Sequence, residues 1–481
     1  MNRRMIFNAV GMMLRVEAAL LLLPAITSAI YRESEAFAFL SAAVLGYAIG
    51  ILPKLLYKPK THVIYAKEGF IIVAFSWIML SLIGSLPFII SGEIPRLADA
   101  FFETVSGFTT TGASILTDVE AHSHGVLFWR SFTHWIGGMG IIVFVTAIIP
   151  NVSERPIHIL RAEMPGPTMG KLVPRIKDTA VILYLIYMVM TVIETVLLCI
   201  GGMPFFESLL HSFGTAGTGG FGLKGNSIAG YSPYIQWVIG IFMVLFGVNF
   251  NLYYLIIIKK LKTAVKSREL WFFFAVIGIS TLLITFNIRY LFGNFSETLR
   301  TAFFQVASII STTGYATADF NTWPQFSRYL ILLLMFFGGC AGSTAGGMKM
   351  SRIMMLFKLI RNETQRLIHP RAVTSLRFEG KTVDGATSRN LSNYFLIYFV
   401  CLAVIVLLLC GEPFSFLTNF SAAVSCFNNV GPGLDAVGPA SNYAAYSDFA
   451  KYILSFAMLL GRLEIFPIII AFSPSAWLRN K

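Results

Sequence analysis

Residues 109–112 read Thr109-Thr110-Thr111-Gly112, a polar run inside an otherwise strongly apolar chain. Three runs of similar composition follow: Ala216-Gly217-Thr218-Gly219, Ser311-Thr312-Thr313-Gly314 and Asn428-Asn429-Val430-Gly431. Each follows a short amphipathic segment and precedes a long apolar one. A membrane interior tolerates non-helical backbone only where that backbone is buried in protein or lines an aqueous cavity. The four runs therefore predict a single cavity that all four of them line. Their backbone carbonyls can replace the water around a cation.

The composition is that of a polytopic helical membrane protein. Of the 481 residues, 56% are hydrophobic and only 13% are charged, whereas soluble domains carry about 25% charged residues. The net charge of +13 would suggest a nucleic-acid partner for a soluble protein. Here the lysines and arginines gather in alternate loops, as the positive-inside rule requires. We therefore expect the membrane as the partner, and no nucleic acid.

Long and short apolar segments alternate along the chain. A span takes about 20 helical residues, and ten stretches are long enough: 7–31, 36–56, 69–91, 126–149, 179–201, 233–258, 270–291, 327–357, 391–410 and 450–472. Shorter segments lie at 97–108, 204–213, 298–310 and 413–426, and each ends at one of the four runs. Their lengths predict half-helices that enter the membrane without crossing it.

Clusters of basic residues predict the orientation. They lie in the loops 53–67, 152–178 and 259–269, in the segment 352–389 and at the chain end. All of them fall on one side of the membrane only if each half-helix returns to the side it came from. The positive-inside rule then predicts that both termini are cytoplasmic and that the four runs lie towards the outer side.

The chain divides into two N-terminal transmembrane helices and four repeated units. Each unit consists of a span, a half-helix, an extended run and a second span, so the predicted fold class is an all-α polytopic membrane protein. The predicted divisions are 1–67 for the N-terminal helices and 68–177, 178–268, 269–389 and 390–481 for the four pore repeats. The second run has extra glycine between Gly214 and Gly220, so we expect its half-helix to be offset by a few residues.

The half-helices supply a reason for cation binding. Each would direct its C-terminal end, with unpaired carbonyls and about half a negative charge, towards the middle of the membrane. Glycine in the following run permits unusual dihedral angles and close approach of backbones. No covalently bound cofactor is expected, because the cation is the substrate. The candidate ion ligands are Thr110, Thr111, Gly112, Thr218, Gly219, Thr312, Thr313, Gly314, Asn429, Val430 and Gly431.

A run of small residues interrupts the span 327–357. Glycine costs about 1 kcal/mol relative to alanine inside a helix, so this density predicts a break. The glycine spacing faintly resembles a phosphate-binding loop, but Met348 stands where lysine is required and no strand precedes it, which excludes that function. We expect instead a flexible plug below the filter. Its residues are Gly338, Gly339, Cys340, Ala341, Gly342, Ser343, Thr344, Ala345, Gly346 and Gly347.

Two basic residues complete the predicted gate. Lys349 either extends to the inner membrane surface, which is favoured, or takes part in the pore. Arg462 lies inside the last span, where a charge must face the pore, a cluster of carbonyls or an acid; a buried structural salt bridge is the alternative. Glu464 would point elsewhere on a helix and is a poor partner for it.

Four acids lie near the predicted outer mouth: Glu103, Asp118, Glu120 and Glu207. They either concentrate cations there or are ordinary solvated loop charges.

No arrangement of nucleophile, base and orienting group is found in the sequence, so we do not expect an enzyme.

Several motifs in order resemble the TrkH-like membrane subunits of bacterial Trk potassium-uptake systems, within the Trk/Ktr/HKT superfamily. The resemblance covers essentially the whole chain. Its motifs are Phe108 to Ser114, Gly214 to Phe221, Ser311 to Thr317, Asn428 to Gly433, His134 to Gly140, Pro165-Gly166-Pro167 and Gly461 to Glu464.

The resemblance implies a pseudo-fourfold pore in the bacterial inner membrane, a homodimer, and a cytosolic nucleotide-binding regulatory ring (TrkA-like) as partner. It also implies potassium selectivity, since Gly112, Gly219, Gly314 and Gly431 stand at the filter positions, and an intramembrane gating loop in the third repeat beside a basic residue. We expect channel-like uptake. The alternative is a secondary transporter that couples potassium to H⁺ or Na⁺, for which Glu194 and Glu464 are the few candidate carboxylates.

Overall fold

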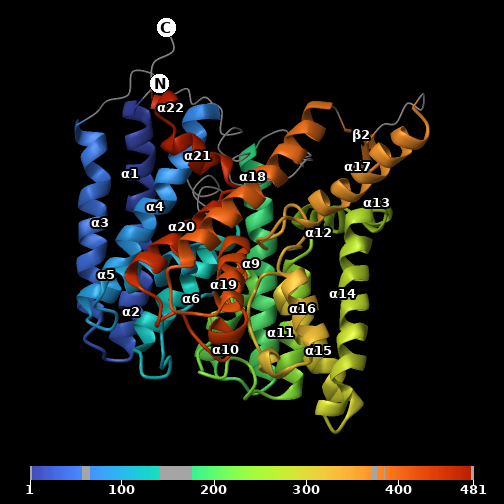
Figure 1. The fold of residues 1–481 in the computed structure, drawn as a ribbon. Coiled ribbons are helices and arrows are strands. Elements are labelled where there is room, and N and C mark those ends of the chain that lie inside the picture. The colour runs from blue at the N-terminus through green and yellow to red at the C-terminus, as the bar shows by residue number, and fades with distance from the viewer. Residues whose placement is uncertain (1–2, 57–65, 141–175, 371–375, 384, 478–481) are drawn as a thin grey trace.

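The computed structural model describes residues 3–56, 66–140, 176–370, 376–383 and 385–477. The molecule is mostly helical (Figure 1), which confirms the predicted fold class. The only strands in these ranges form one short antiparallel pair, β1 (Arg377–Phe378) and β2 (Lys381–Thr382). Parts of the basic loops, at 57–65 and 152–175, lie outside the described residues, as do Pro165-Gly166-Pro167 and the end of the predicted span 126–149.

The helices follow the predicted order of units. The N-terminal helices are α1 (Arg3–Leu20), α2 (Leu22–Ile30) and α3 (Ala36–Leu56). The first unit contains α4 (Ala66–Ile90), α5 (Leu97–Phe108) and α6 (His124–Gly138). The second contains α9 (Ile176–Ile200), α10 (Phe205–Gly217), α11 (Pro233–Phe246), α12 (Phe250–Ile257) and the short α13 (Leu261–Val265).

The third unit begins with α14 (Arg268–Ile288) and continues with η1 (Arg289–Leu291), α15 (Phe295–Ile310), η2 (Phe320–Thr322), α16 (Gln325–Leu334) and α17 (Met350–Ile368). The fourth contains α18 (Gly385–Leu409), α19 (Phe416–Asn428), η3 (Asp435–Val437), α20 (Asp448–Arg462), α21 (Phe466–Phe472) and α22 (Pro474–Trp477). The four predicted half-helices are therefore present as α5, α10, α15 and α19.

The second spans differ from the sequence prediction. Six helices in the described ranges are long and apolar enough to cross a membrane, or up to eight if each bent pair is one span. The sequence predicts ten spans, and one of them, 126–149, ends outside the described residues. The break in the third unit is present between α16 and α17, but it is not the only one. Helix α11 meets α12 at 91°, and α20 meets α21 at 118°. Asn249 caps α12 after the first bend, and Glu464 and Ile465 have positive φ at the second.

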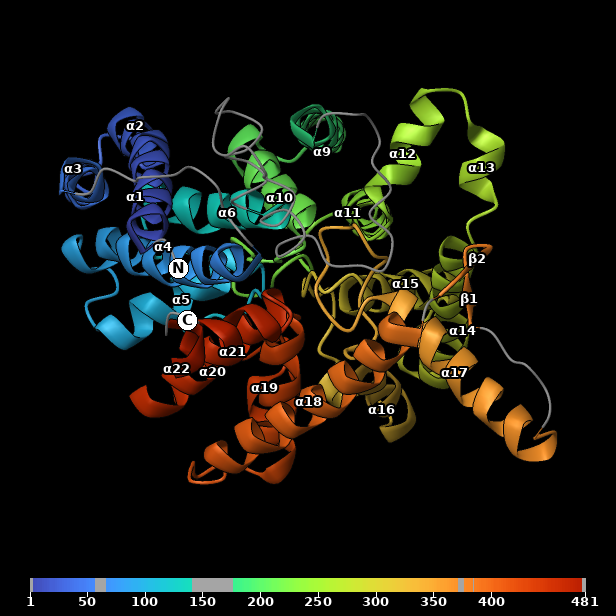
Figure 2. The ribbon, with the colours of Figure 1, turned by 90° about the horizontal axis from the view of Figure 1, so that it is seen from above.

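The four units surround a common centre. Viewed from above, they follow one another in chain order around it, with α1, α2 and α3 at the periphery (Figure 2). Three of the four half-helices pack against the second span of the preceding unit: α10 contacts α6, α15 contacts α11, and α5 contacts α20. This cyclic packing agrees with a pseudo-fourfold arrangement.

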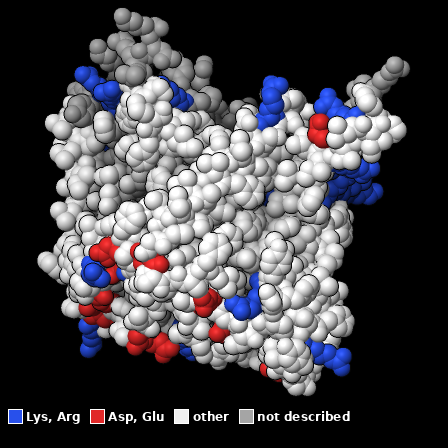
Figure 3. Space-filling view, in the orientation of Figure 1, with Lys and Arg blue, Asp and Glu red and all other residues white. Residues whose placement is uncertain are grey.

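The first and last residues that the structure describes lie together on one face. The guanidinium of Arg3, at the start of α1, donates a hydrogen bond to the carbonyl of Trp477 at the end of α22, at 3.2 Å. Lysine and arginine gather at this end of the molecule, acids gather towards the opposite end, and a largely uncharged band separates them (Figure 3). The band is what a lipid-facing surface requires.

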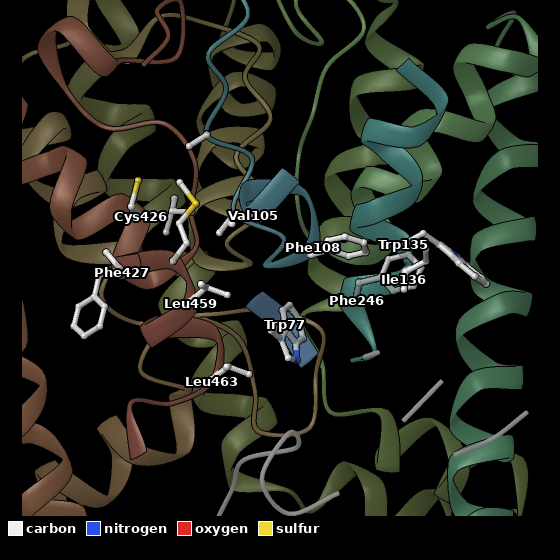
Figure 4. Packing of buried hydrophobic residues seen from close by; sticks show 14 of the residues in the cluster. Trp77, Val105, Phe108, Trp135, Ile136, Phe246, Cys426, Phe427, Leu459 and Leu463 are labelled. Carbon is white, nitrogen blue, oxygen red and sulfur yellow. The ribbon is translucent and has the colours of Figure 1, made fainter. Parts of the chain in front are cut away.

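Apolar side chains from several units pack around the central runs, among them Phe108, Trp135, Phe246 and Phe427 (Figure 4). Phe108, the last residue of α5, lies edge-on to Trp129 at 5.9 Å between ring centroids. The indole nitrogen of Trp129 donates to the carbonyl of Gly84 in α4, at 2.9 Å. Helices α4, α5 and α6 thus hold the start of the first run in place.

Candidate functional site

One or two residues after the end of each half-helix lies a residue with left-handed backbone. The values of φ are 55° at Thr110, 57° at Thr218, 57° at Thr312 and 56° at Asn429. A β-branched residue in this region is a genuine outlier and costs about 1–3 kcal/mol. Because three threonines adopt the same conformation at equivalent places, the surrounding structure must impose it. Strain of this kind is concentrated at functional sites.

Two residues later each run has a glycine with positive φ, and this corrects the register of the second run. These glycines are Gly112, Gly220, Gly314 and Gly431, with φ of 77°, 72°, 87° and 101°. The hydrogen bond that closes each half-helix agrees: the amides of Thr111, Gly219, Thr313 and Val430 donate to the carbonyls of Ser106, Gly214, Ser308 and Ser425. Gly219 is therefore equivalent to Thr111, and Gly220 takes the place that the sequence comparison assigned to Gly219. The expected offset is one residue, and Gly214 stands where the other units have serine.

The four glycines and their neighbours form a closed ring. A Cβ added to any of these glycines would come closer to a carbonyl oxygen of the next unit than side chains approach in real structures. The pairs are Gly112 with the oxygen of Gly219, Gly220 with that of Thr313, Gly314 with that of Val430, and Gly431 with that of Thr111. Glycine is thus required at each position both by φ and by contact with the neighbouring backbone.

Side-chain hydroxyls brace the ring from behind. The hydroxyls of Thr109 and Thr111 lie 2.8 Å apart, and those of Ser311 and Thr313 lie 2.7 Å apart. Asn429 joins the last unit to the first, because its amide nitrogen donates to the hydroxyl of Thr111 at 2.9 Å. The sequence did not reveal this bracing role for Thr109 and Ser311.

A cavity of about 130 Å³ lies on one side of the ring. All four positive-φ glycines line it, together with Arg130 and residues of the loops that follow the runs. Backbone from all four units, far apart in the sequence, thus meets at one cavity, to which the second unit contributes Gly220 rather than a residue of 216–219.

Glu103 is buried and paired, so it fits neither expectation: it does not attract cations at the mouth, and it is not a solvated loop charge. It is 1% exposed, and one carboxylate oxygen accepts from Arg130 Nε at 2.5 Å while the other accepts from the amide of Ile115 at 2.9 Å. Arg130 also donates to the carbonyl of Gly222, at 3.0 Å, and lies over the ring of Phe221. The pair therefore braces the extended segments that follow the first and second runs. Its place inside α5 was the signal that Glu103 would be buried.

On the opposite side of the ring lies the α16–α17 loop, defined as residues 335–349. The backbone amide of Gly346 donates to the hydroxyl of Thr312 at 2.7 Å. A Cβ on Gly346 would lie 2.6 Å from the carbonyl oxygen of Asn428. The predicted plug segment therefore touches the third and fourth runs directly.

The α16–α17 loop is also fastened to the bend between α11 and α12. The amide of Cys340 donates to the carbonyl of Gly247 at 2.9 Å, and the carbonyl of Gly342 accepts from the amide of Phe250 at 3.0 Å. Glu269, in the first turn of α14, accepts from the amide of Ala341 at 2.7 Å. These anchors explain how a segment rich in glycine holds one shape.

Arg462 is placed among carbonyl oxygens, one of the surroundings expected for it. Its guanidinium donates to Thr344 of the loop at 2.8 Å and to Gly137 and Gly138 of α6 at 2.5 and 2.8 Å. Glu464 forms an ion pair with Arg352. This agrees with the prediction that Glu464 would be a poor partner for Arg462.

Lys349 does not extend to the membrane surface, contrary to the favoured expectation. It is 6% exposed, and Nζ donates to the carbonyl of Ala345 at 2.6 Å. Lys349 and Arg462 line a cavity of about 50 Å³ with Trp77, Glu464 and small residues of the loop. Two basic side chains therefore lie together on this side of the ring.

Known proteins match this chain along nearly its full length. The family model "TrkH: Cation transport protein" matches residues 35–481. The Trk system potassium uptake protein TrkH of Salmonella typhimurium is 37% identical, over 99% of this chain and 100% of its own length. TrkG of Escherichia coli strain K12 is 34% identical over 98% of each chain.

A solved structure agrees in fold. The crystal structure of the potassium transporter TrkH from Vibrio parahaemolyticus matches with a TM-score of 0.90 at 32% identity, covering 99% of this chain and 100% of that chain. Together with the helical spans and the ring built from four units, these matches show that the chain belongs to the TrkH family of cation transport proteins, a family of membrane transporters and not of enzymes.

Proposed function

We propose that this protein is the potassium-conducting membrane subunit of a bacterial Trk uptake system. Its relatives are named as potassium uptake proteins. The observation that carries the proposal is the closed ring, in which each unit's glycine leaves room only for the next unit's carbonyl. Such a ring offers oxygen ligands at a fixed spacing, which a monovalent cation needs in place of water.

In this mechanism the ion dehydrates at the ring without meeting a carboxylate. The half-helices α5, α10, α15 and α19 end there, and their C-terminal dipoles favour positive charge. The proposed filter comprises the eleven residues predicted from the sequence, with Gly220 added. Left-handed Thr110, Thr218, Thr312 and Asn429 turn the chain from helix to extended run. Potassium is the substrate, and the mechanism needs no covalently bound cofactor.

The α16–α17 loop is the proposed gate. It lies against the third and fourth runs and would obstruct an ion leaving the ring. Arg462 holds Thr344 of this loop against the end of α6, and its charge repels a cation beneath the filter. Opening therefore requires that Arg462 and Gly346 release their partners.

The alternative, coupling of potassium to H⁺ or Na⁺, would use intramembrane carboxylates. Glu464 lines the inner cavity but is paired with Arg352. Glu194 is fully buried in α9 and does not line either cavity described above. Neither residue recurs in the other units. These positions favour conduction down the electrochemical gradient.

We further propose a multi-pass protein of the bacterial inner membrane with cytoplasmic termini. The basic face that carries both chain ends supports this orientation. The resemblance to Trk subunits supports a homodimer that docks a cytosolic nucleotide-binding ring (TrkA-like) on the same face.

Replacing Gly112 by Ser should lower the potassium-to-sodium permeability ratio by roughly tenfold, because displacing one carbonyl ligand costs at least about 1.4 kcal/mol. The measurement is the reversal potential in bi-ionic conditions. Gly92→Ser is a matched control, since Gly92 also has positive φ (79°) but faces open space. An unchanged ratio in correctly folded Gly112→Ser protein would refute the filter assignment.

Arg462→Ala should raise potassium flux severalfold, because it removes three hydrogen bonds that fix the loop and a charge beneath the ring. Flux into liposomes is compared with that of Arg361→Ala, which removes an exposed charge from α17. Arg462→Lys keeps the charge but not the planar donor set, so its potassium flux should lie between those of Arg462→Ala and Arg361→Ala. Equal or lower flux from folded Arg462→Ala protein would contradict the gate.

Cys410 tests the orientation, since it is exposed at the end of α18 opposite the basic face. A membrane-impermeant maleimide should label it in intact cells, and Cys410→Ser should abolish that labelling. A cysteine introduced by Lys262→Cys in the Cys410→Ser background should react only in inside-out vesicles. Reversed labelling would overturn the assigned orientation.

A further inference from the structure

A compact basic element protrudes from the second unit. We call residues 250–267, comprising α12, α13 and their turns, the α12–α13 hairpin. Lys259, Lys260, Lys262 and Lys266 are all exposed on it, Arg268 follows directly, and it contains no acid. Lys and Arg are gathered over this part of the surface (Figure 3). Like charges this dense repel one another unless an anionic partner compensates them.

The same element exposes large apolar side chains between its lysines. Ile257 is 63% exposed, Leu261 55% and Val265 46%. Trp271, at the start of α14, is 58% exposed, and tryptophan is typical of the level where membrane meets water. Apolar and basic side chains side by side favour a membrane surface over an acidic soluble protein, because the apolar groups can enter the lipid boundary while lysines contact headgroups.

The hairpin has the geometry for this contact. The 91° bend after α11 turns α12 away from the direction of the span, and α13 leads back to α14. From above, α12 and α13 lie outside the ring of units (Figure 2). The hairpin therefore lies along the basic face rather than across the membrane.

Both ends of the hairpin are joined to the α16–α17 loop. Before α12, the carbonyl of Gly247 accepts from Cys340; at its first residue, the amide of Phe250 donates to Gly342. After α13, Glu269 accepts from the amide of Ala341. Three consecutive loop residues are thus held by the two ends of one surface element.

We propose that the α12–α13 hairpin binds anionic phospholipid headgroups of the cytoplasmic leaflet, and that this binding stabilises the plugged arrangement of the α16–α17 loop. A ligand shifts a conformational equilibrium only by binding one state better. Lipid that fixes the hairpin along the membrane favours the state in which both hairpin ends hold the loop. The effect on flux rests on the proposed potassium conduction, whereas the lipid site does not.

The test compares three proteins, each assessed for folding by size-exclusion chromatography. The first is the wild type, and the second carries Lys259→Gln, Lys260→Gln, Lys262→Gln and Lys266→Gln. The third is a matched control that loses four exposed charges elsewhere on the same face: Lys54→Gln, Arg361→Gln, Arg366→Gln and Arg389→Gln. Retention of phosphatidylglycerol is measured by native mass spectrometry, and potassium flux is measured in vesicles of phosphatidylcholine alone or mixed equally with phosphatidylglycerol.

The wild type and the control should retain phosphatidylglycerol and conduct several times less in the mixed vesicles than in phosphatidylcholine. The hairpin variant should retain at least tenfold less, since each lysine contributes roughly fivefold to binding an anionic surface, and its flux should be equal in both vesicles. Equal retention by the hairpin variant and the wild type overturns the lipid site and assigns the lysines to an acidic protein partner. If the hairpin variant loses phosphatidylglycerol as expected but the wild-type flux is the same in both kinds of vesicle, the lipid site stands and the proposed effect of lipid on the α16–α17 loop is overturned. Absence of potassium flux in every protein refutes the proposed function and leaves the retention result to decide the site.

Discussion

The contact between a glycine of one unit and a carbonyl oxygen of the next is the constraint on which the rest depends. It occurs four times around one centre, between units that are distant in sequence. A side chain at any of the four positions would push the neighbouring backbone aside. The left-handed residue that follows each half-helix, the hydroxyl pairs behind the runs and the Glu103–Arg130 pair all serve to hold this contact in place.

The four units are similar in backbone but not in their attachments. Among the residues that the structure describes, a long loop separates the last two helices of the third unit, and that loop reaches back beneath the ring to Thr312. The loop is in turn held by the second unit through Gly247 and Phe250, and by the fourth through Arg462. A change at the membrane surface of the second unit can therefore reach the α16–α17 loop through few intermediate contacts.

Much of this arrangement could be read from the sequence, because membrane burial leaves few options. The half-helices followed from their lengths, their common side from the lysine and arginine loops, and the broken span from the density of small residues. The register of the second run could not be predicted, because Gly219 and Gly220 are the same residue type. Their backbone φ angles and hydrogen bonds distinguish them, and the sequence shows neither. The bends at 247–249 and 463–465 were missed for a related reason: a capping asparagine and two residues with positive φ leave little trace in hydropathy. Lys349 was misplaced because its partners are backbone carbonyls of a loop, which no pattern of side chains reveals.

The central claim is that four backbone runs form one cation-selective passage that works without a coupled ion. It is tested most directly by the reversal potential of the purified protein in liposomes under controlled voltage, with potassium, sodium and pH gradients varied separately. The account predicts that this potential follows the potassium gradient, responds little to sodium, and is unchanged by external pH at fixed potassium. A reversal potential that shifts with the proton or sodium gradient would contradict it and establish coupled transport.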